Sequence, residues 1–201
     1  MGRPAPEGIR IIDATIDDAP LIARAIMDAV GPEIVNGMAG ENGSADDVFG
    51  VFTRLARRDD SQYSYLNTRI ALAPDGKKAG VCVSYSGKEL IPLRRAFFNE
   101  ARQVFGWQLT PEEVDSLPGE TTPEEFYLDT LSTLPKYRGQ GIATALIADA
   151  KLKADQCGLP LGLLCADDNP RARKLYESIG FQPVGRRLFA GEEMTNMRLI
   201  E

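Results

Sequence analysis

Two glycines in a short polar loop give the clearest sign of chemistry in this sequence. Gly139 and Gly141 lie in Arg138-Gly-Gln-Gly-Ile-Ala143, where a strand-like run passes into a run with helical spacing. At such a junction the unpaired amides of the first helical turn and the positive end of the helix dipole point toward one spot. Because glycine has no Cβ, a bulky phosphate can approach the main chain closely. The loop predicts an anion site that suits a diphosphate, although two glycines can also form only a tight turn.

The spacing of these glycines separates the loop from two other phosphate-binding loops. A P-loop needs a Lys-Ser/Thr pair after its last glycine, whereas Ile142 and Ala143 follow Gly141 here. The dinucleotide fingerprint GxGxxG is longer. Nucleotide hydrolases and dehydrogenases are therefore disfavoured, and a nucleotide-binding module that uses the same loop is kept as a third class of function.

A second element with chemical potential runs from Asn169 to Phe181. Asn169 precedes Pro170, which is favoured at the first position of a helix, so its plainest interpretation is an N-cap. Tyr176 follows nearly two turns later, so both side chains leave the helix on the same side. A tyrosine with apolar neighbours usually fills a core. Beside a bound thioester, however, its phenol (pKa about 10) could protonate a departing thiolate (pKa about 8.5).

The general base must be found without histidine, because the sequence contains none. This excludes a Ser-His-Asp triad, a Cys-His dyad and histidine metal sites within the chain. Asp129 is the first choice, because period-two alternation in a strand would place Tyr127, Asp129 and Leu131 on one face. A carboxylate at this position could equally bond to local backbone. Glu33, Glu125 and a chain of waters are the alternatives.

The overall charge narrows the class of partner. With 29 acidic and 23 basic residues the net charge is −6, and no long run of Lys or Arg offers the cationic surface that nucleic acid requires. The acidity mildly favours cationic substrates such as amines. We therefore do not expect DNA or RNA as a partner.

Hydrophobic stretches and cysteines indicate the compartment. The apolar runs are much shorter than the ~20 residues that span a bilayer, and Met1 to Ile9 lacks the apolar core of a secretory signal. The three cysteines form no CxxC pair, which argues against a disulfide framework and a thiolate zinc site. We predict a cytoplasmic protein that needs no membrane and no metal.

Hydrophobic periodicity predicts one domain over residues 1–201 in which strands and helices alternate. In the first half we expect a strand at Ile9 to Ile12, a helix at Pro20 to Val30, a loop at Gly31 to Gly43, a helix at Ala45 to Arg57, and a hairpin of Tyr65 to Leu72 and Ala79 to Ser84. A helix at Glu89 to Phe105 and an acidic segment follow, and residues 86–124 are predicted to be an insertion on the substrate side. In the second half we expect a strand at Phe126 to Thr133, a helix that ends near Cys157-Gly158, a strand at Leu161 to Ala166, a helix at Pro170 to Ile179 capped by Gly180, and an extended stretch from Phe181 to about Ile200.

Two blocks, separated by a helix and a strand, together resemble the GNAT superfamily of acyl-CoA-dependent N-acyltransferases. Arg138, Gly141 and Ala143 match the family's Arg/Gln-x-x-Gly-x-Gly/Ala signature. The family's Asn-to-Gly-Phe block is matched by Asn169, Ala172, Leu175, Tyr176, Gly180 and Phe181. The match covers about residues 126–181, and outside it only the order of elements agrees.

The resemblance implies an α/β (α+β) fold with a mixed, mostly antiparallel central sheet, helices on both faces and splayed central strands. Residues 126–181 would form the acetyl-CoA-binding core, with the pantetheine arm between the strands at 126–133 and 161–166. The implied contacts are the main chain at Leu131, Ser132 and Thr133, the amides of Arg138, Gly139, Gln140, Gly141, Ile142 and Ala143, and the side chains of Asn169 and Tyr176. Basic residues flank these loops and could meet the 3′-phosphate, namely Lys136, Arg171, Arg173 and Lys174.

The resemblance further implies an enzyme that moves an acetyl group from acetyl-CoA to a primary amine by direct attack in a ternary complex. In this hypothesis Tyr176 protonates the thiolate, the amide of Leu131 stabilises the developing oxyanion, and Asp129 accepts the amine's proton. Some family members carry a glutamate four residues before the Leu131 position, where this sequence has Tyr127, so the base does not carry over. The alternative function is a catalytically silent acyl-CoA-binding module. The identity of the amine stays open, and a homodimer is one option for the assembly.

Overall fold

The computed structural model describes residues 8–41 and 43–200, while residues 1–7, 42 and 201 lie outside the description. The prediction about a leader at Met1 to Ile9 therefore falls almost entirely outside the described residues. The same holds for the two ends of the predicted domain.

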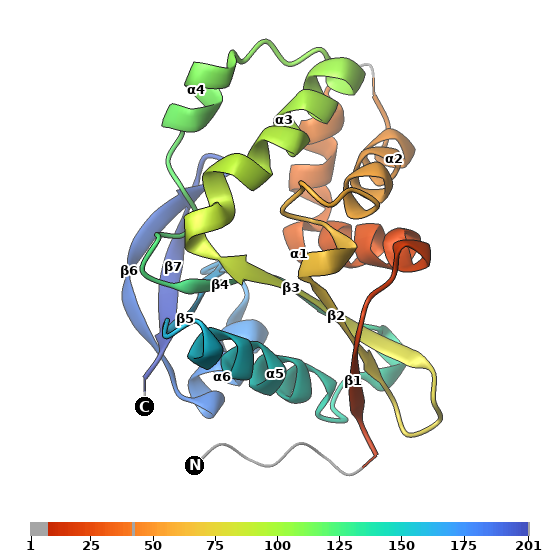
Figure 1. Ribbon diagram of the computed structural model, residues 1–201, viewed down its shortest axis with the longest axis vertical. Helices are drawn as coiled ribbons and strands as arrows, with labels where there is room; N and C mark the ends of the chain where they lie inside the picture. Colours follow the sequence, from red (N-terminus) through yellow and green to blue (C-terminus); the bar gives the residue numbers. More distant parts are fainter. Residues whose placement is uncertain (1–7, 42, 201) are drawn as a thin grey trace.

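A seven-stranded sheet in the order β1-β2-β3-β4-β5-β7-β6 forms the centre of the molecule (Figure 1). Its strands are β1 (Arg10–Asp13), β2 (Thr68–Leu72), β3 (Lys78–Ser86), β4 (Phe126–Thr133), β5 (Leu161–Cys165), β6 (Phe181–Phe189) and β7 (Glu192–Leu199). Neighbouring strands are antiparallel except β4 and β5, which are parallel. The predicted mixed, mostly antiparallel sheet is confirmed.

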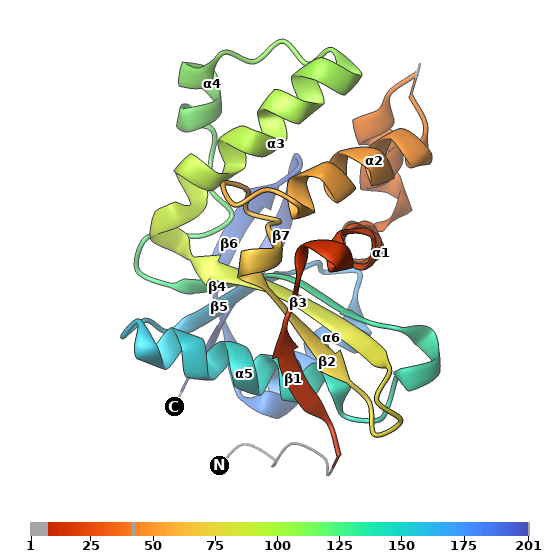
Figure 2. The ribbon, with the colours of Figure 1, turned by 45° about the vertical axis from the view of Figure 1, so that its right-hand side comes forward.

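Helices cover both faces of this sheet, as Figures 1 and 2 show. One face carries α1 (Ala19–Ala39), α2 (Ala45–Ala56), α3 (Leu90–Phe105) and the short α4 (Pro111–Ser116), and the other carries α5 (Ile142–Gln156) and α6 (Pro170–Ile179). Two hydrophobic cores result, one under α1 to α3 and one under α5 and α6. The sheet between them positions the ends of β4 and β5.

The predicted loop at Gly31 to Gly43 is largely helical, which corrects the sequence interpretation. Gly31 has φ 84° and interrupts α1, and Pro32 then begins a second helical segment that continues to Ala39. Proline is favoured at the first position of a helix, so the Gly-Pro pair marks a break followed by a restart. Glu33 consequently lies on a helix and not in a flexible loop.

The predicted extended stretch from Phe181 to about Ile200 is a hairpin of two strands, β6 and β7. The chain reverses at Ala190 and Gly191, which have φ values of 51° and 87°. Alanine rarely adopts a positive φ. The sequence has Ala-Gly at this turn instead of the Asn-Gly or Asp-Gly pair that is typical of a hairpin, so residue type does not indicate the turn.

A bulge in β4 changes which side chains share a face. Two consecutive residues of β3 face Thr130 and Leu128, so Asp129 between them has no partner on β3. An extra residue of this kind shifts the alternation of side chains by one. Tyr127 packs in the core under α1 to α3, whereas Leu131 packs toward α5. The prediction that Tyr127, Asp129 and Leu131 share one face is therefore wrong for Leu131.

The two central strands separate soon after they meet. β4 and β5 pair over only three residues each, from Phe126 to Leu128 and from Leu161 to Leu163. Beyond this point β4 continues to Thr133 and β5 to Cys165 without pairing to each other. The predicted splay is confirmed, and the gap opens at the carboxyl ends of both strands.

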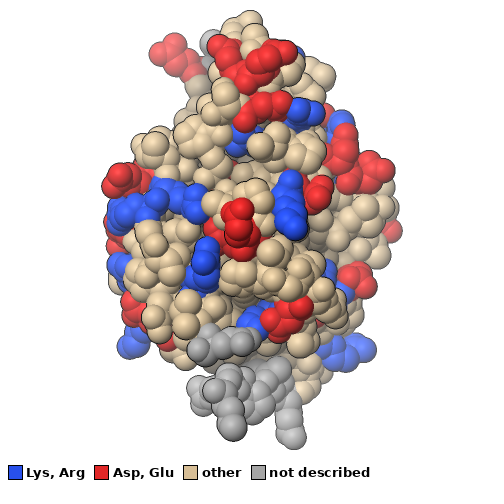
Figure 3. Space-filling model, turned by 60° about the vertical axis from the view of Figure 1, so that its left-hand side comes forward, with Lys and Arg blue, Asp and Glu red and all other residues tan. Residues whose placement is uncertain are grey.

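Charged side chains of both signs are interspersed on the face that carries β6 and β7 (Figure 3). Arg186, for example, pairs with Asp167 at 2.7 Å and with Glu193 at 3.4 Å. Among residues 8–41 and 43–200 no helix combines the length and apolar character needed to cross a membrane.

Candidate active site

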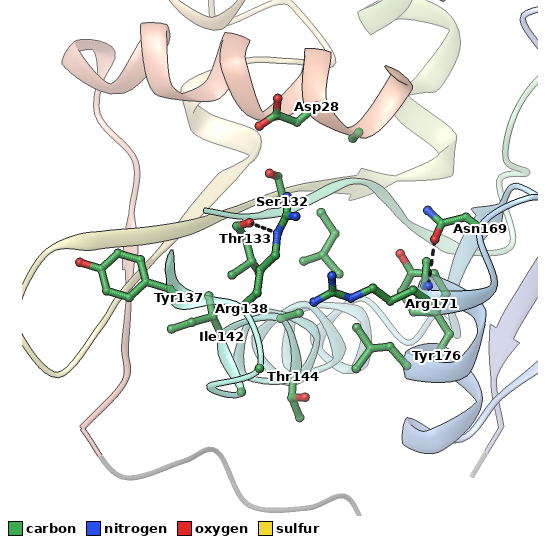
Figure 4. A pocket seen from close by; sticks show the side chains of 17 residues that line it. Asp28, Ser132, Thr133, Tyr137, Arg138, Ile142, Thr144, Asn169, Arg171 and Tyr176 are labelled. Carbon is green, nitrogen blue, oxygen red and sulfur yellow. Dashed lines mark hydrogen bonds between the residues drawn. The ribbon is translucent and has the colours of Figure 1, made fainter. Parts of the chain in front are cut away.

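The gap between β4 and β5 opens into a cavity of about 600 Å³ (Figure 4). Its wall contains all of the predicted cofactor residues except Gln140, namely Leu131, Ser132, Thr133, Arg138, Gly139, Gly141, Ile142, Ala143, Asn169 and Tyr176. The side chain of Gln140 turns back instead, because its Nε2 donates a 2.9 Å hydrogen bond to the carbonyl of Lys136. The structure thus gathers residues from three separate elements around one space.

The glycine loop has a conformation that requires glycine. Gly139 and Gly141 have φ values of 77° and 84°, and Gly141 is the N-cap of α5. A β-carbon on Gly139 would meet no atom within 4 Å, so the backbone conformation, and not crowding, selects glycine there. The first amides of α5 have no acceptor within the helix, so they are available to an anion in the cavity.

Two guanidinium groups add positive charge to this cavity. The Nε of Arg138 donates a 3.1 Å hydrogen bond to the carbonyl of Thr133, which holds the side chain along the end of β4. Arg171 reaches in from the first turn of α6, and Asp28 faces the loop from α1 (Figure 4). Helix amides and two arginines fit the diphosphate of a coenzyme A thioester.

Asn169 serves as the N-cap of α6. Its Oδ1 accepts a 3.0 Å hydrogen bond from the amide of Ala172, so the plain interpretation is correct. Among the described residues its Nδ2 has no hydrogen-bond partner. The carboxamide can therefore cap the helix and still donate into the cavity that it lines.

Tyr176 is half-buried in the wall of the same cavity. Its ring lies 5.7 Å from that of Phe181, and its hydroxyl bonds to none of the residues that the structure describes. Burial, followed by the nearby Cys165 and Cys82, raises the pKa of this phenol above its ordinary value. The hydroxyl therefore keeps its proton across the neutral range and can donate it.

A second cavity, of about 510 Å³, adjoins the first. The two share wall residues, which include Asp28, Leu131, Asn169 and Tyr176. The second cavity is lined by five carboxylates and by no Lys or Arg among the described residues; the five are Asp28, Glu33, Asp129, Asp168 and Glu192. Arg138 and Arg171 line only the first cavity and four of the five carboxylates line only the second, while Asp28, Leu131 and Tyr176 belong to both.

Asp129 sits at the bulge of β4 in the wall of the second cavity. Its Oδ2 accepts hydrogen bonds from the Tyr85 hydroxyl at 2.7 Å and from Gln62 Nε2 at 3.4 Å, and its Oδ1 accepts one from Thr130 at 3.0 Å. Burial raises the pKa of this carboxyl, and the three donors oppose that effect. A carboxylate offers about four lone-pair sites, so one remains to accept a proton.

The other two candidate bases have different surroundings. Glu125 is 1% exposed and pairs with Arg187 at 3.4 Å and Arg198 at 3.5 Å, and it lines neither cavity. These ion pairs give Glu125 a structural role, which argues against Glu125 as the base. Glu33 is exposed and lines the second cavity, so it remains open to an amine.

Several residues of the two walls were not predicted. Asp28 and Ile34 enter from α1, and Phe189, Glu192 and Met194 enter from the β6–β7 hairpin. Ile34 falls where the sequence predicts a loop, and the three hairpin residues fall where it predicts a single extended stretch. Asp28 lies in the predicted helix, but nothing in the sequence indicates that its side chain faces the cavity. Arg171 is one of the basic residues that the sequence analysis places near the 3′-phosphate, because it lies in the first turn of the helix that follows Asn169.

Comparison with known proteins finds similarity to one family. A model for the acetyltransferase (GNAT) domain matches residues 116–201, which span β4 to β7 with α5 and α6. These residues are similar to a GNAT acetyltransferase domain, and the mixed, mostly antiparallel sheet matches the fold of solved acetyltransferases. The resemblance seen in the sequence is confirmed, and the GNAT domain supports acyl transfer as the activity.

Solved structures extend the likeness over most of the GNAT-fold chain. A crystal structure of an acetyltransferase is 27% identical with a TM-score of 0.71, covering 94% of this chain and 97% of that one. An N-acetyltransferase from Staphylococcus aureus Mu50 is 24% identical with a TM-score of 0.73, covering 94% and 99%. No curated protein sequence matches significantly. Within the part that the structure describes, no group of three or more Cys, Asp or Glu is arranged to hold a metal ion.

Proposed function

We propose that this GNAT-domain protein transfers an acetyl group from acetyl-CoA to a primary amine by direct attack in a ternary complex. The observation that carries the proposal is the meeting of two cavities of opposite charge at Leu131 and Tyr176. An anionic cosubstrate and a cationic acceptor can then lie on either side of the same two residues.

The cosubstrate side is proposed to hold coenzyme A by its diphosphate. The amides from Gly139 to Ala143 and the guanidinium of Arg171 supply the donors, whereas the amide of Arg138 donates to the carbonyl of Pro135 at 3.3 Å. The edge of β4 that does not pair with β5, at Leu131 to Thr133, offers backbone groups to the pantetheine arm. This arm would take the place of the missing strand pairing between β4 and β5. The bound thioester supplies the activated acyl group.

The acceptor side is proposed to take a cationic amine. The five carboxylates that line the second cavity attract an ammonium group and disfavour an anionic acceptor. The transfer reaction then needs a base, because an ammonium nitrogen has no free electron pair with which to attack the thioester. Asp129 is proposed to accept that proton directly or through a water.

The transfer step uses three groups of this chain. The amine nitrogen attacks the thioester carbon, and the proposed donor to the carbonyl oxygen is the amide of Leu131. The carbon–sulfur bond breaks, the sulfur takes the proton of the Tyr176 hydroxyl, and the second proton that the nitrogen loses as the amide forms restores that hydroxyl. Because the pKa of Tyr176 is raised, its proton is present when the thiolate leaves.

The domain description also belongs to this proposal. Residues 126–181 are proposed as the acetyl-CoA-binding core and residues 86–124, which hold α3 and α4, as the substrate-side insertion. Cytoplasmic residence and a homodimer stay predictions.

Replacement of Tyr176 by Phe tests the proposal and its alternative, a catalytically silent binder. Acetyl-CoA-dependent thiol release is measured over a panel of amines, and acetyl-CoA affinity by calorimetry. We expect affinity to change little and turnover to fall by about 10²- to 10⁴-fold. Tyr65→Phe is the matched control, because Tyr65 lies outside both cavities. Wild-type protein that binds acetyl-CoA but acetylates no amine would favour the silent module.

A further inference from the structure

Asp129 has a polar neighbourhood on the side away from the cavity. The buried amide of Gln62 lies between two carboxylates, with its Nε2 3.4 Å from Asp129 Oδ2 and 3.5 Å from Glu120 Oε1. Both contacts are long for hydrogen bonds. Because the two oxygens flank one nitrogen, they lie no more than about 7 Å apart, a separation at which charges interact appreciably away from bulk water.

The segment that carries Glu120 is held firmly against α3. Arg94 is 4% exposed, and its guanidinium donates to four carbonyls between residues 114 and 118, at 2.6 Å to Val114 and 3.0 Å to Leu117. A β-carbon on Gly119 would lie 2.9 Å from the carbonyl of Thr121, so the backbone is tightly folded there. These contacts give the Glu120 carboxylate a defined place behind the wall of the second cavity.

The charges that surround the pair leave it without a dedicated cation. Within residues 8–41 and 43–200, the side chains that act on Glu120 are Asp129, Gln62 and one cation, Arg94, whose guanidinium is committed to carbonyls. The groups that bond to Asp129 or interact with its charge are Tyr63, Tyr85, Tyr127, Cys82, Thr130, Gln62 and Glu120. All of the ionisable ones among these are neutral or anionic at neutral pH.

We propose that Glu120 is a positioning residue for the base, whose negative charge, presented through Gln62, makes Asp129 a stronger proton acceptor. The inference rests on the proposed function, in which Asp129 receives the proton of the amine. Glu120 itself lines neither cavity and touches no reactant. The proposal gives the predicted insertion at 86–124 a chemical task, because Glu120 belongs to it.

The electrostatics of the two carboxyls agree with this arrangement. Burial, with Asp129 as the next contribution, raises the pKa of Glu120 to about 7. The coupling is mutual, since an anion that disfavours ionisation of its neighbour is equally disfavoured by it. Near neutral pH the pair therefore binds a proton more readily than an isolated carboxylate would.

The decisive measurement is a carboxylate NMR titration of Asp129 in the free protein, compared between wild type and Glu120→Gln. We expect the Asp129 midpoint to move down by roughly 0.5 to 1.5 pH units, because the neighbouring negative charge is gone. The midpoint of the acid limb of the kcat/KM profile should shift to lower pH by a similar amount. Glu124→Gln is the matched control, since Glu124 is exposed, lies in the same segment and should leave the midpoint in place.

The outcomes separate this inference from the proposed function. An unchanged Asp129 midpoint in Glu120→Gln would overturn the role of Glu120, whatever the activity. A shifted midpoint in a protein that acetylates no amine would support the coupling and reject the enzyme. Should Glu120→Gln not fold, Glu120→Ala is titrated in its place; it also removes the neighbouring negative charge, so the Asp129 midpoint must fall, and a constant value contradicts the proposal.

Discussion

The Tyr85 hydroxyl on β3 donates a 2.7 Å hydrogen bond to Oδ2 of Asp129, the bulged residue of β4. This bond joins the two strands at the point where their regular register is interrupted. The tyrosine is 3% exposed, so its partner is held from the protein side while the cavity side stays free. The carboxylate is thereby fixed in orientation without being closed off from an acceptor.

Replacement of Tyr85 by Phe is expected to raise the pKa of Asp129 further, because a donor to the anionic form is lost. A hydrogen bond of about 1 kcal/mol corresponds to roughly 0.7 pH unit. The acid limb of the kcat/KM profile should move upward by about that amount, opposite to the direction for Glu120→Gln. If the midpoint of the acid limb shifts to lower pH or stays constant, Asp129 is not the group that titrates in that limb.

Replacement of Asp129 by Asn should lower kcat/KM by about 10²- to 10⁴-fold near pH 7 and leave acetyl-CoA affinity nearly unchanged. The pKa of Asp129 is raised, so the wild-type rate should fall as pH drops through it, because the protonated carboxyl cannot accept the amine's proton. The Asn variant should instead recover rate as pH rises toward the pKa of the amine. Stopped-flow thiol release across pH tests this, and a variant with the wild-type profile would transfer the role to Glu33 or water.

Replacement of Gly141 by Ala is expected to impair cosubstrate binding. A β-carbon at φ 84° costs about 1–2 kcal/mol, and relief of that strain would turn the amides at the start of α5 away from the cavity. We expect a rise of tenfold or more in the dissociation constant of acetyl-CoA by calorimetry. Gly158→Ala, at φ 65° after the other end of α5, should lose similar stability but bind normally. Equal losses of affinity in both variants would contradict the predicted diphosphate site.

Replacement of Glu125 by Gln should reduce stability and spare chemistry. Arg187 and Arg198 would lose their buried anionic partner, and breaking such a cluster costs about 3 kcal/mol. Urea unfolding should show this loss, whereas kcat at 25 °C stays close to the wild-type value. A collapse of kcat in a stable, folded variant would return Glu125 to the list of bases.

Replacement of Glu33 and Glu192 by Gln should weaken binding of cationic amines. Both carboxylates line the second cavity from its exposed rim, so their attraction acts at a distance and is screened by salt. We expect KM for the amine to rise by roughly two- to fivefold at low salt, and the difference from wild type to shrink at high salt. KM for acetyl-CoA should be unaffected. Glu41→Gln, outside both cavities, serves as the control.

The sequence predicted the cosubstrate side of the site well because that side depends on local rules. The positive φ values at Gly139, Gly141 and Gly180 and the N-cap at Asn169 all follow from residue type at the junction of two elements. The splay of β4 and β5 came instead from the family resemblance. Neither source of prediction needed contacts between distant parts of the chain.

The acceptor side was predicted less well because it is assembled over long separations. Asp28, Asp129 and Glu192 meet in one wall, but they come from a helix, a bulge and a hairpin that carry no shared motif. The bulge at Asp129 has no sequence signature here, and it reversed the expected face of Leu131. The neighbours of Asp129, Gln62 and Tyr85, became visible only once β3 and the segment after α2 were placed against β4.

The brief pairing of β4 with β5 has a mechanical consequence. Three residue pairs, the ion pairs of Glu125 and the core beneath α5 join β1 to β4 to the remaining strands, so the backbone pairing between these two panels of the sheet is short. A coenzyme arm lying between the panels would lengthen that joint on both sides. Hydrogen exchange of the amides in β4 and β5 should therefore slow together when the thioester binds. The bound thioester should also raise the temperature at which the two panels separate.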